Sequence, residues 1–239
     1  MKNELTVGIT THGHRCEWLR DMLNGLYRFA QVKFRVIIVD NSSKDNTLDY
    51  LEKLTVIKDM EVIRNQENVD DSGGMNQILS IVSSPYLLKI DTDTLFTREG
   101  PVDAILNQMK DTGVSLIGHY WDLSLRRRKE IGAWGHSHGM RNKFDQADEV
   151  ARAINSHFEV TTRLPRGNFM LMKVDDIRKV GGFDIRYPHN AMEYSLAMRL
   201  LEVGLDYAEF LDESVIHRPT DDLRLKVRAQ LPDLLSEKL

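Results

Sequence analysis

The apolar positions of the first 120 residues follow two alternating spacings, and together they predict a series of β–α units. Short runs rich in Val, Ile and Leu are typical of buried strands. Such runs occur at Leu5–Thr10, Phe34–Val39, Glu61–Arg64, Tyr86–Ile90 and Val114–His119. Apolar residues spaced as in helices packed on a sheet occur at Glu17–Phe29, Thr47–Leu54, Met75–Val82 and Val102–Lys110. This order predicts an α/β fold whose central sheet is mostly parallel and flanked by helices.

The pattern changes in the second half of the chain. Between Trp121 and Thr162 the chain is rich in Gly, His, Arg and other polar residues, and one helix is expected there, at Gln146–Asn155. Regular spacing then returns in a strand at Asn168–Val174, helices at Asp175–Val180 and Leu196–Val203, and a leucine-bearing helical tail after Pro219. We expect a single domain over residues 1–239, made of segments 1–120, 121–219 and 220–239.

Composition narrows the class of protein. With 41% hydrophobic and 28% charged residues the chain has ordinary globular composition, and no apolar run approaches the length of a transmembrane helix. The start at Met1 shows no signal-peptide pattern, and the single Cys16 excludes an intramolecular disulfide, so we expect a cytoplasmic protein. A net charge of −4 gives no general attraction for polyanions, and the basic run Arg126–Lys129 is more typical of a solvated loop.

Polar side chains follow each of the first four predicted strands. Ligands of open parallel sheets bind at the carboxyl ends of the strands, so these side chains are expected to line a site. Asp40, which closes an apolar run, suits either a turn or a carboxylate that accepts a pyrimidine ring N–H or a ribose hydroxyl. Asp45 and Asn46 suit a cap of the following helix.

Two carboxylates, Asp91 and Asp93, emerge from the strand that ends at Ile90. Holding two such groups close together is unfavourable unless a cation neutralises them, and hard oxygen ligands suit Mg²⁺ or Mn²⁺. A divalent ion there would bridge a diphosphate and stabilise the charge on a leaving nucleoside diphosphate. Two aspartates with one residue between them are common by chance, but their position directly after a buried strand supports a metal site here.

Four motifs in order resemble the family 2 glycosyltransferases with the GT-A (Rossmann-like) fold, and are similar in pattern to the galactofuranosyltransferase and rhamnosyltransferase-like branch. The motifs are Val7–His12, Ile38–Thr47, Arg64–Asn68 followed by Ser72–Asn76, and the Asp91–Asp93 segment. The resemblance implies a nucleoside-diphosphate sugar donor held by residues 1–120, with residues 121–219 as the acceptor-side half. The donor-nucleotide residues that it implies are Thr10, Thr11, His12, Arg15, Asp40, Asn41, Ser43, Arg64, Asn65, Asn68, Gly74, Asn76, Asp91 and Thr92.

The resemblance continues downstream through Pro165–Met172 and Val180–Asp184. Family members carry a glutamate–aspartate pair shortly before a helical arginine, and counting back from Arg199 places Met192 and Glu193 at that pair. The first acid is therefore missing and the second is Glu. The resemblance makes Glu193 the general base of an inverting transfer to an acceptor hydroxyl.

A histidine is implied to complete the metal site. The resemblance adds His217 to Asp91 and Asp93 as a ligand of Mn²⁺ or Mg²⁺, and imidazole suits Mn²⁺. His136 and His138 lack an evident third ligand, so we expect a flexible loop there.

The acceptor side is less defined. Trp134 suits stacking on a sugar, and the resemblance adds Arg166, Gly167 and Asn168. The acceptor is expected to be a hydroxyl of a glycan, a lipid-linked sugar, a protein or a modified base. The tail suits docking on the body of the protein or on a second copy, which leaves a homodimer open.

Three other functions fit parts of the sequence. Leu88–Leu95 also resembles the signature of haloacid-dehalogenase phosphatases, but that family places it on the opening strand. Met192 in place of an acid suits a catalytically silent nucleotide-sugar-binding module. A sugar-1-phosphate nucleotidyltransferase would need a glycine-rich loop near the N-terminus, which Gly8 and Gly13 alone do not form.

Overall fold

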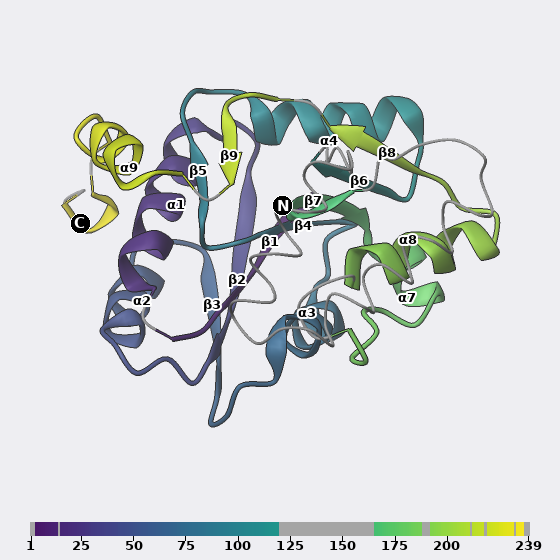
Figure 1. The fold of residues 1–239 in the computed structure, drawn as a ribbon, viewed down its shortest axis with the longest axis horizontal. Helices are drawn as coiled ribbons and strands as arrows, with labels where there is room; N and C mark the ends of the chain where they lie inside the picture. Colours follow the sequence, from purple (N-terminus) through teal and green to yellow (C-terminus); the bar gives the residue numbers. More distant parts are fainter. Residues whose placement is uncertain are drawn as a thin grey trace, which may run out of the picture.

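The computed structural model describes residues 3–13, 15–119, 165–187, 192–210, 212–217, 219–231 and 233–236. Its centre is a seven-stranded sheet in the order β3-β2-β1-β4-β7-β6-β8 (Figure 1). The strands are β1 (Leu5–Thr11), β2 (Phe34–Asn41), β3 (Met60–Asn65), β4 (Tyr86–Ile90), β6 (Leu116–His119), β7 (Arg166–Lys173) and β8 (Tyr207–Phe210). Strand β7 runs antiparallel to β4 and β6, and the other pairs are parallel. The predicted, mostly parallel sheet is confirmed.

Helices cover both faces of this sheet (Figure 1). One face packs on α1 (Cys16–Phe29), α2 (Thr47–Thr55) and α4 (Pro101–Thr112), and the other on α3 (Asp70–Ile81), α7 (Val174–Lys179) and α8 (Met192–Glu202). The strands supply apolar side chains to both layers because successive side chains point to opposite faces. In β2, Val36 and Ile38 join the first layer, whereas Ile37 and Val39 join the second.

The predicted strands and helices of the first half are all present, with small changes in their ends. Helix α3 begins at Asp70 and not at the predicted Met75. The prediction missed its first turns because they carry acids and the Gly73–Gly74 pair and so show no helical apolar pattern. Strands β5 (Thr94–Phe96), β8 and β9 (Val215–His217) were not predicted, because they are too short to show a period. The helix expected at 146–155 lies outside the described residues.

A second, two-stranded sheet carries the end of the chain back to the turn after β4. Strands β5 and β9 pair antiparallel, with Thr94 opposite His217. Since Asp93 directly precedes Thr94, this pairing places the imidazole beside the carboxylates of the turn. The position of His217 is thus set by backbone pairing between segments far apart in sequence.

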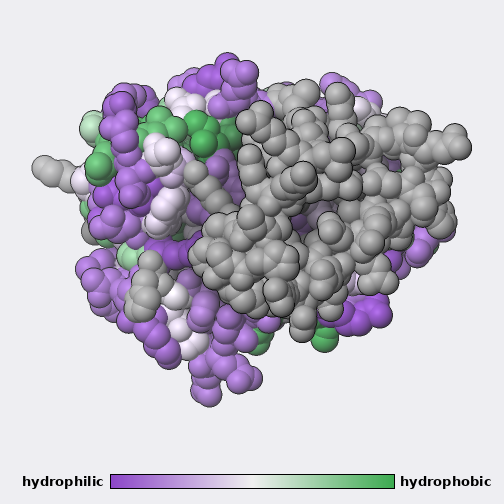
Figure 2. Space-filling model, viewed as in Figure 1, coloured by the Kyte–Doolittle hydropathy of each residue, from purple (hydrophilic) through white to green (hydrophobic). Residues whose placement is uncertain are grey.

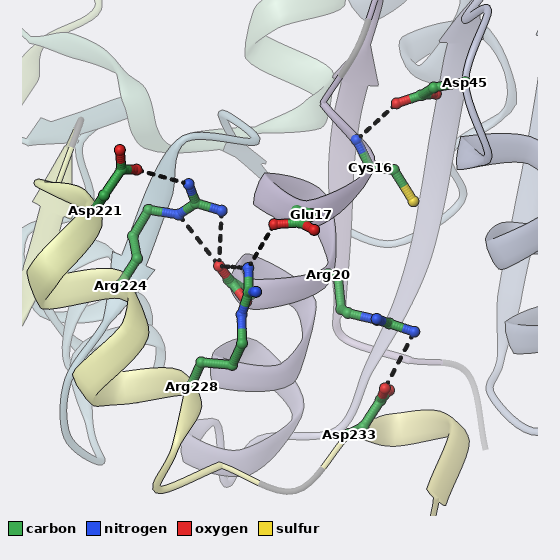
Figure 3. A network of polar contacts seen from close by, with 9 residues as sticks. Cys16, Glu17, Arg20, Asp45, Asp221, Arg224, Arg228 and Asp233 are labelled. Carbon is green, nitrogen blue, oxygen red and sulfur yellow. Dashed lines mark hydrogen bonds and ion pairs between the residues drawn. The ribbon is translucent and has the colours of Figure 1, made fainter.

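The C-terminal tail docks on α1 of the same chain through α9 (Asp221–Arg228) and the 3₁₀ turn η1 (Leu234–Ser236). The guanidinium groups of Arg224 and Arg228 both donate to the carboxylate of Asp21, which is 4% exposed. Arg228 also reaches Glu17 (Figure 3). Arg224 stacks over Trp18 with 3.7 Å between the guanidinium carbon and the ring centroid. The tail is therefore anchored on the body by a buried carboxylate between two arginines.

The outer side of this docked tail exposes some apolar surface. Hydrophobic atoms gather toward the upper left of Figure 2, over α9 and the adjoining β9, on a face that is otherwise mostly hydrophilic where it is coloured. Leu225 of α9 is 60% exposed. Among the described residues no helix is both long and apolar enough to cross a membrane.

We predict that Asp21→Ala lowers the free energy of unfolding by about 3 kcal/mol, because it leaves two guanidinium groups without their shared carboxylate. Asp222→Ala is the matched control, since Asp222 forms an exposed ion pair with Lys226 within α9. This substitution should change the free energy of unfolding by about 0.5 kcal/mol or less. Urea unfolding followed by circular dichroism measures both. Equal effects of the two substitutions would contradict the anchoring role.

Candidate functional site

Three potential metal ligands meet at the carboxyl end of β4. Asp91 and Asp93 come from the turn between β4 and β5, and His217 comes from β9. One ligand atom from each lies within 4.8 Å of the others. His217 Nε2 is 3.2 Å from Asp93 Oδ1 and 3.9 Å from Asp91 Oδ2. The structure brings together the three residues that the sequence predicted as ligands.

This set fits a divalent cation. Ligand atoms at about 2.1 Å from one octahedral ion lie about 3 Å apart, which is close to the observed separations. Two carboxylates and an imidazole are a hard-to-borderline donor set suited to Mn²⁺ or Mg²⁺. Arg15, 54% exposed, places its guanidinium 3.6 Å from the second oxygen of Asp93. The site therefore carries cationic as well as anionic groups, as binding of a diphosphate requires.

Behind these ligands lies a buried ion cluster that sequence reasoning missed. Lys89 of β4 is 1% exposed and pairs with Asp91 and with Asp71 of α3, whose Oδ2 is 3.1 Å from the ammonium. Burial opposes the charge of Lys89, but the two carboxylates outweigh it and hold the pKa of the ammonium above its usual value. A lysine inside the otherwise apolar run Tyr86–Ile90 was the available signal, because a buried lysine needs an acidic partner.

Glu193, the predicted base, lies in the first turn of α8, on the same side of the sheet as this cluster. Burial raises the pKa of its carboxyl to about 7, against the lowering effects of its own backbone N–H and of Lys89. A side chain built on Gly167 would lie 3.5 Å from the Glu193 carboxylate and 3.6 Å from the Lys89 ammonium. The three residues are therefore neighbours, and the carboxyl is suited to proton transfer near neutral pH.

Unpartnered polar atoms line the ends of β1 and β2. Asp40 is 1% exposed; its Oδ2 accepts from the Ser43 backbone N–H at 3.2 Å, whereas its Oδ1 has no partner. The hydroxyl oxygens of Ser43 and Thr11 are also buried without a partner. Thr11 lies opposite Asp40 in the β1–β2 ladder. Because buried polar groups are normally satisfied, these atoms indicate a place where a ligand supplies the missing hydrogen bonds.

An amide network supports this edge of the sheet. Asn65 Nδ2 donates to Asn41 Oδ1 at 2.8 Å and to Gln77 Oε1 at 2.9 Å, and Asn41 Nδ2 donates to the Asp70 carbonyl. The ring Nδ1 of His12 lies 2.5 Å from the Asn41 carbonyl oxygen. The predicted residues Asn41 and Asn65 are thus hydrogen-bonded to each other, and the His12 ring contacts the Asn41 backbone.

Gly74 allows α3 to approach the end of β1 closely. A Cβ at this position would lie 2.7 Å from the methyl carbon of Thr10, a distance that real side chains do not adopt. Thr10 in turn donates its hydroxyl to Asp71. The absence of a side chain at Gly74 is therefore a condition for joining β1 to the acidic turn of α3.

Three other predicted donor residues are bonded elsewhere. Arg64 pairs with Glu52 at the surface, Asn68 accepts from the Asp70 backbone N–H, and Asn76 exchanges hydrogen bonds with the Phe183 backbone. The structure does not bring these side chains to the carboxylates after β4. Thr92 lies between the two aspartates and is 5% exposed.

On the acceptor side, β7 contributes backbone and side-chain groups. The Gly167 carbonyl accepts from Lys89 at 2.8 Å, and the Asn168 carbonyl accepts from the Asp91 backbone N–H at 3.0 Å. The Asn168 side chain is 2% exposed, and both of its polar atoms lack a partner. Trp134 and the side chain of Arg166 lie outside the described residues, as do His136, His138 and the run 126–129.

Met192, which stands where an acid was expected, is turned into the core. It is 1% exposed, belongs to the layer formed by α3, α7 and α8, and its sulfur accepts from the Ser72 hydroxyl at 3.3 Å. A carboxylate at that place would be buried in apolar surroundings. The first turn of α8 carries one acid, Glu193.

The chain is similar in sequence to known glycosyltransferases. Residues 6–168 match the family model described as Glycosyl transferase family 2. Poly-beta-1,6-N-acetyl-D-glucosamine synthase of Staphylococcus aureus (strain COL) is 27% identical over 101 residues, covering 42% of this chain and 24% of that protein. Poly(ribitol-phosphate) beta-N-acetylglucosaminyltransferase TarS of Staphylococcus aureus (strain MW2) is 25% identical over 167 residues, covering 67% and 27%. The matched region spans about a quarter of the length of these curated relatives.

Solved structures show the same fold. The mannosyltransferase PcManGT from Pyrobaculum calidifontis, in complex with GDP-Man and Mn²⁺, superposes with a TM-score of 0.65 at 14% identity over 97% of this chain and 62% of that chain. Staphylococcus aureus TarS 1-349 in complex with UDP gives 0.60 at 13% identity, over 95% and 63%. These similarities confirm the predicted GT-A type α/β domain.

Proposed function

Because this chain belongs to glycosyltransferase family 2, we propose that it transfers a sugar from a nucleoside-diphosphate sugar to an acceptor hydroxyl, with a divalent metal ion and inversion at the sugar carbon. The observation that carries the proposal is the convergence of Asp91, Asp93 and His217 beside unpartnered polar atoms of Asp40, Ser43 and Thr11. The two carboxylates and the imidazole suit a metal-bound diphosphate, and the unpartnered polar atoms suit a nucleoside. Both lie at the carboxyl edge of the sheet, where ligands of such folds bind.

The buried Asp40 carboxylate supports a choice among nucleobases. Its Oδ1 is an acceptor without a partner, so a base with a ring N–H, such as uracil, thymine or guanine, satisfies it. Adenine and cytosine present an acceptor at the corresponding ring nitrogen and leave the carboxylate opposed to a lone pair. We infer a uridine, thymidine or guanosine diphosphate donor.

The chemical roles follow from the side chains around this pocket. Asp91, Asp93 and His217 would hold Mn²⁺ or Mg²⁺, which would supply positive charge against the charge that develops on the leaving diphosphate. Arg15, which already reaches Asp93, adds a second cation on the solvent side. Glu193 accepts the proton of the acceptor hydroxyl as its oxygen attacks the sugar carbon from the face opposite the leaving group. Asn168 offers an unpartnered amide within the β7 segment next to Asp91.

The pKa of Glu193 predicts a rise of activity with pH. A general base works in its ionised form, and burial raises the pKa of this carboxyl to about 7. The rate constant kcat is therefore expected to increase by about tenfold per pH unit below 7 and to level off above it. A stopped-assay profile from pH 5.5 to about 8.5 at saturating Mn²⁺ measures this. A flat profile through pH 7 would remove Glu193 from the role of base.

The proposal is tested by thermal unfolding with a panel of nucleoside diphosphates and their sugars, with and without Mn²⁺. Donors of N-acetylglucosamine, mannose, rhamnose and galactofuranose belong in the panel, since the relatives and the predicted branch point to them. Metal-dependent stabilisation by a uridine, thymidine or guanosine nucleotide, and none by adenosine or cytidine nucleotides, is expected. An unchanged midpoint with every nucleotide would contradict the donor site.

A second candidate is a nucleotide-sugar-binding module without transfer activity. The buried Met192 in place of an acid favours it, because the start of α8 then offers one carboxylate where two are expected. The two candidates differ in turnover: metal-dependent binding without any donor consumption supports the module. The haloacid-dehalogenase alternative leaves Asp40, Ser43 and Thr11 unexplained, and β4 is the fourth strand of the chain.

A further inference from the structure

A lysine is buried in the strand that leads into the proposed metal turn. Lys89 is 1% exposed and lies on the same face of β4 as Leu87, the face that packs on α3 and α8. Removing an ammonium group from water is costly unless carboxylates or other acceptors replace the lost hydration. The groups that contact the Lys89 ammonium therefore indicate the role of its positive charge.

The Lys89 ammonium contacts oxygens from three different elements. Lys89 donates to the carboxylate of Asp91 in the β4–β5 turn, to the Gly167 carbonyl of β7 at 2.8 Å, and pairs with Asp71 Oδ2 of α3 at 3.1 Å. Because Lys89 is 1% exposed and surrounded by these three oxygens, its charge is used within the protein and is closed off from a substrate phosphate.

Asp71 extends the link to the nucleotide side. Its other oxygen accepts the hydroxyl of Thr10, at the end of β1. A continuous path of polar contacts therefore runs from Thr10 through Asp71 and Lys89 to Asp91. This path joins the edge that faces the nucleoside to the turn that faces the metal.

The two oxygens of Asp91 have different partners. Oδ1 is held by Lys89, and Oδ2 is directed to His217 Nε2, 3.9 Å away. Fixing one oxygen to a buried cation restricts rotation of the carboxylate and leaves the other oxygen on the side of Asp93 and His217. The metal-facing geometry of Asp91 is thus set by a group that does not itself reach the metal position.

We propose that Lys89 is a positioning residue, a resident cation that balances Asp71 and Asp91 and assembles the metal-binding turn before a divalent ion arrives. This inference rests on the proposed function, because it takes Asp91, Asp93 and His217 as the metal ligands. Without Lys89, the carboxylates of Asp71 and Asp91 repel each other, and a divalent ion becomes the means of neutralising them. Metal release after each turnover would then leave the site unbalanced.

The first test measures unfolding without metal in Lys89→Met, Asp71→Asn and the double variant. We expect Lys89→Met to lower Tm by about 10 °C, because a buried pair loses one partner. The double variant should recover roughly half of that loss, since it removes the stranded carboxylate as well. Mn²⁺ should raise the Tm of Lys89→Met by more than it raises that of the wild type, because the ion supplies the missing charge.

The second test measures the Kd for Mn²⁺ alone from the electron paramagnetic resonance signal of the free ion. In Asp71→Asn, Lys89 loses one of its two paired carboxylates and the cluster loses a negative charge, so Kd should rise on the order of tenfold. A purely structural pair would lower Tm in this variant and leave Kd unchanged. Asp71→Asn thus decides the question even if Lys89→Met does not fold.

Equal midpoints of wild type and Lys89→Met, or an unaltered Mn²⁺ Kd in Asp71→Asn, would overturn the inference. A wild-type protein that binds no Mn²⁺ contradicts the proposed metal site instead. In that case the metal-free midpoints still decide whether Lys89 balances the carboxylates.

Discussion

Replacing Glu193 by Gln is expected to lower kcat by about a thousandfold while Mn²⁺-dependent nucleotide binding stays within about twofold of the wild type. The amide keeps the size of the side chain but cannot accept the acceptor proton. Glu193 interacts electrostatically with Lys89 and Asp91, and because the substitution keeps the size of the side chain, the metal ligands should keep their arrangement. Initial rates of nucleoside diphosphate release and thermal shifts with the nucleotide measure the two effects.

Glu193→Asp is the matched control, because it restores the carboxylate that family members carry at this place. We expect it to retain at least about a tenth of wild-type kcat, and to show a rise of activity with pH as the wild type does. Comparable rates for Glu193→Gln and the wild type would assign the proton transfer to another group. A loss of nucleotide binding in Glu193→Gln would point to a structural role.

Replacing Asp93 by Ala is expected to abolish the Mn²⁺-dependent part of nucleotide binding and to lower kcat/KM by about a thousandfold or more. Asp93 is the carboxylate nearest to His217, and its second oxygen lies 3.6 Å from Arg15. Its loss removes a metal ligand and leaves the guanidinium without its anion. Titration calorimetry with the nucleotide, with and without Mn²⁺, separates the metal-dependent part.

Asp175→Ala serves as the surface control for this substitution, since the Asp175 side chain is 98% exposed in α7 and its pair with Arg178 is long, at 3.9 Å. Its binding and rates should match those of the wild type. Metal-dependent binding that survives in Asp93→Ala would contradict the proposed ligand set of Asp91, Asp93 and His217.

The sheet could be predicted from the sequence because its strands are buried and apolar. Val36–Val39 shows this most clearly, and the polar residues after the first, second and fourth strands could be placed at one edge from the parallel order alone. The same reasoning placed Asp91 and Asp93 together. The resemblance supplied His217, and the β5–β9 pairing explains how a residue so distant in sequence reaches them.

The buried cluster around Lys89 could not be predicted in the same way. Asp71 reads as an ordinary acid in the first turn of a helix, and its contact with Lys89 depends on how α3 packs against β4. Lys89 itself was visible as a lysine in an apolar run, but its partners were not. The docking of α9 on Asp21 is a similar case, since Arg224 and Asp21 are 203 positions apart.

Donor consumption tests the central claim most directly. Wild-type protein is incubated with Mn²⁺ and each nucleoside-diphosphate sugar of the panel, and the release of nucleoside diphosphate is followed by chromatography, with Asp93→Ala and Glu193→Gln beside it. The account predicts Mn²⁺-dependent release from a uridine, thymidine or guanosine donor, strongly reduced in both variants. Metal-dependent binding of a donor that is never consumed, with or without candidate acceptors, would contradict the account and identify a binding module.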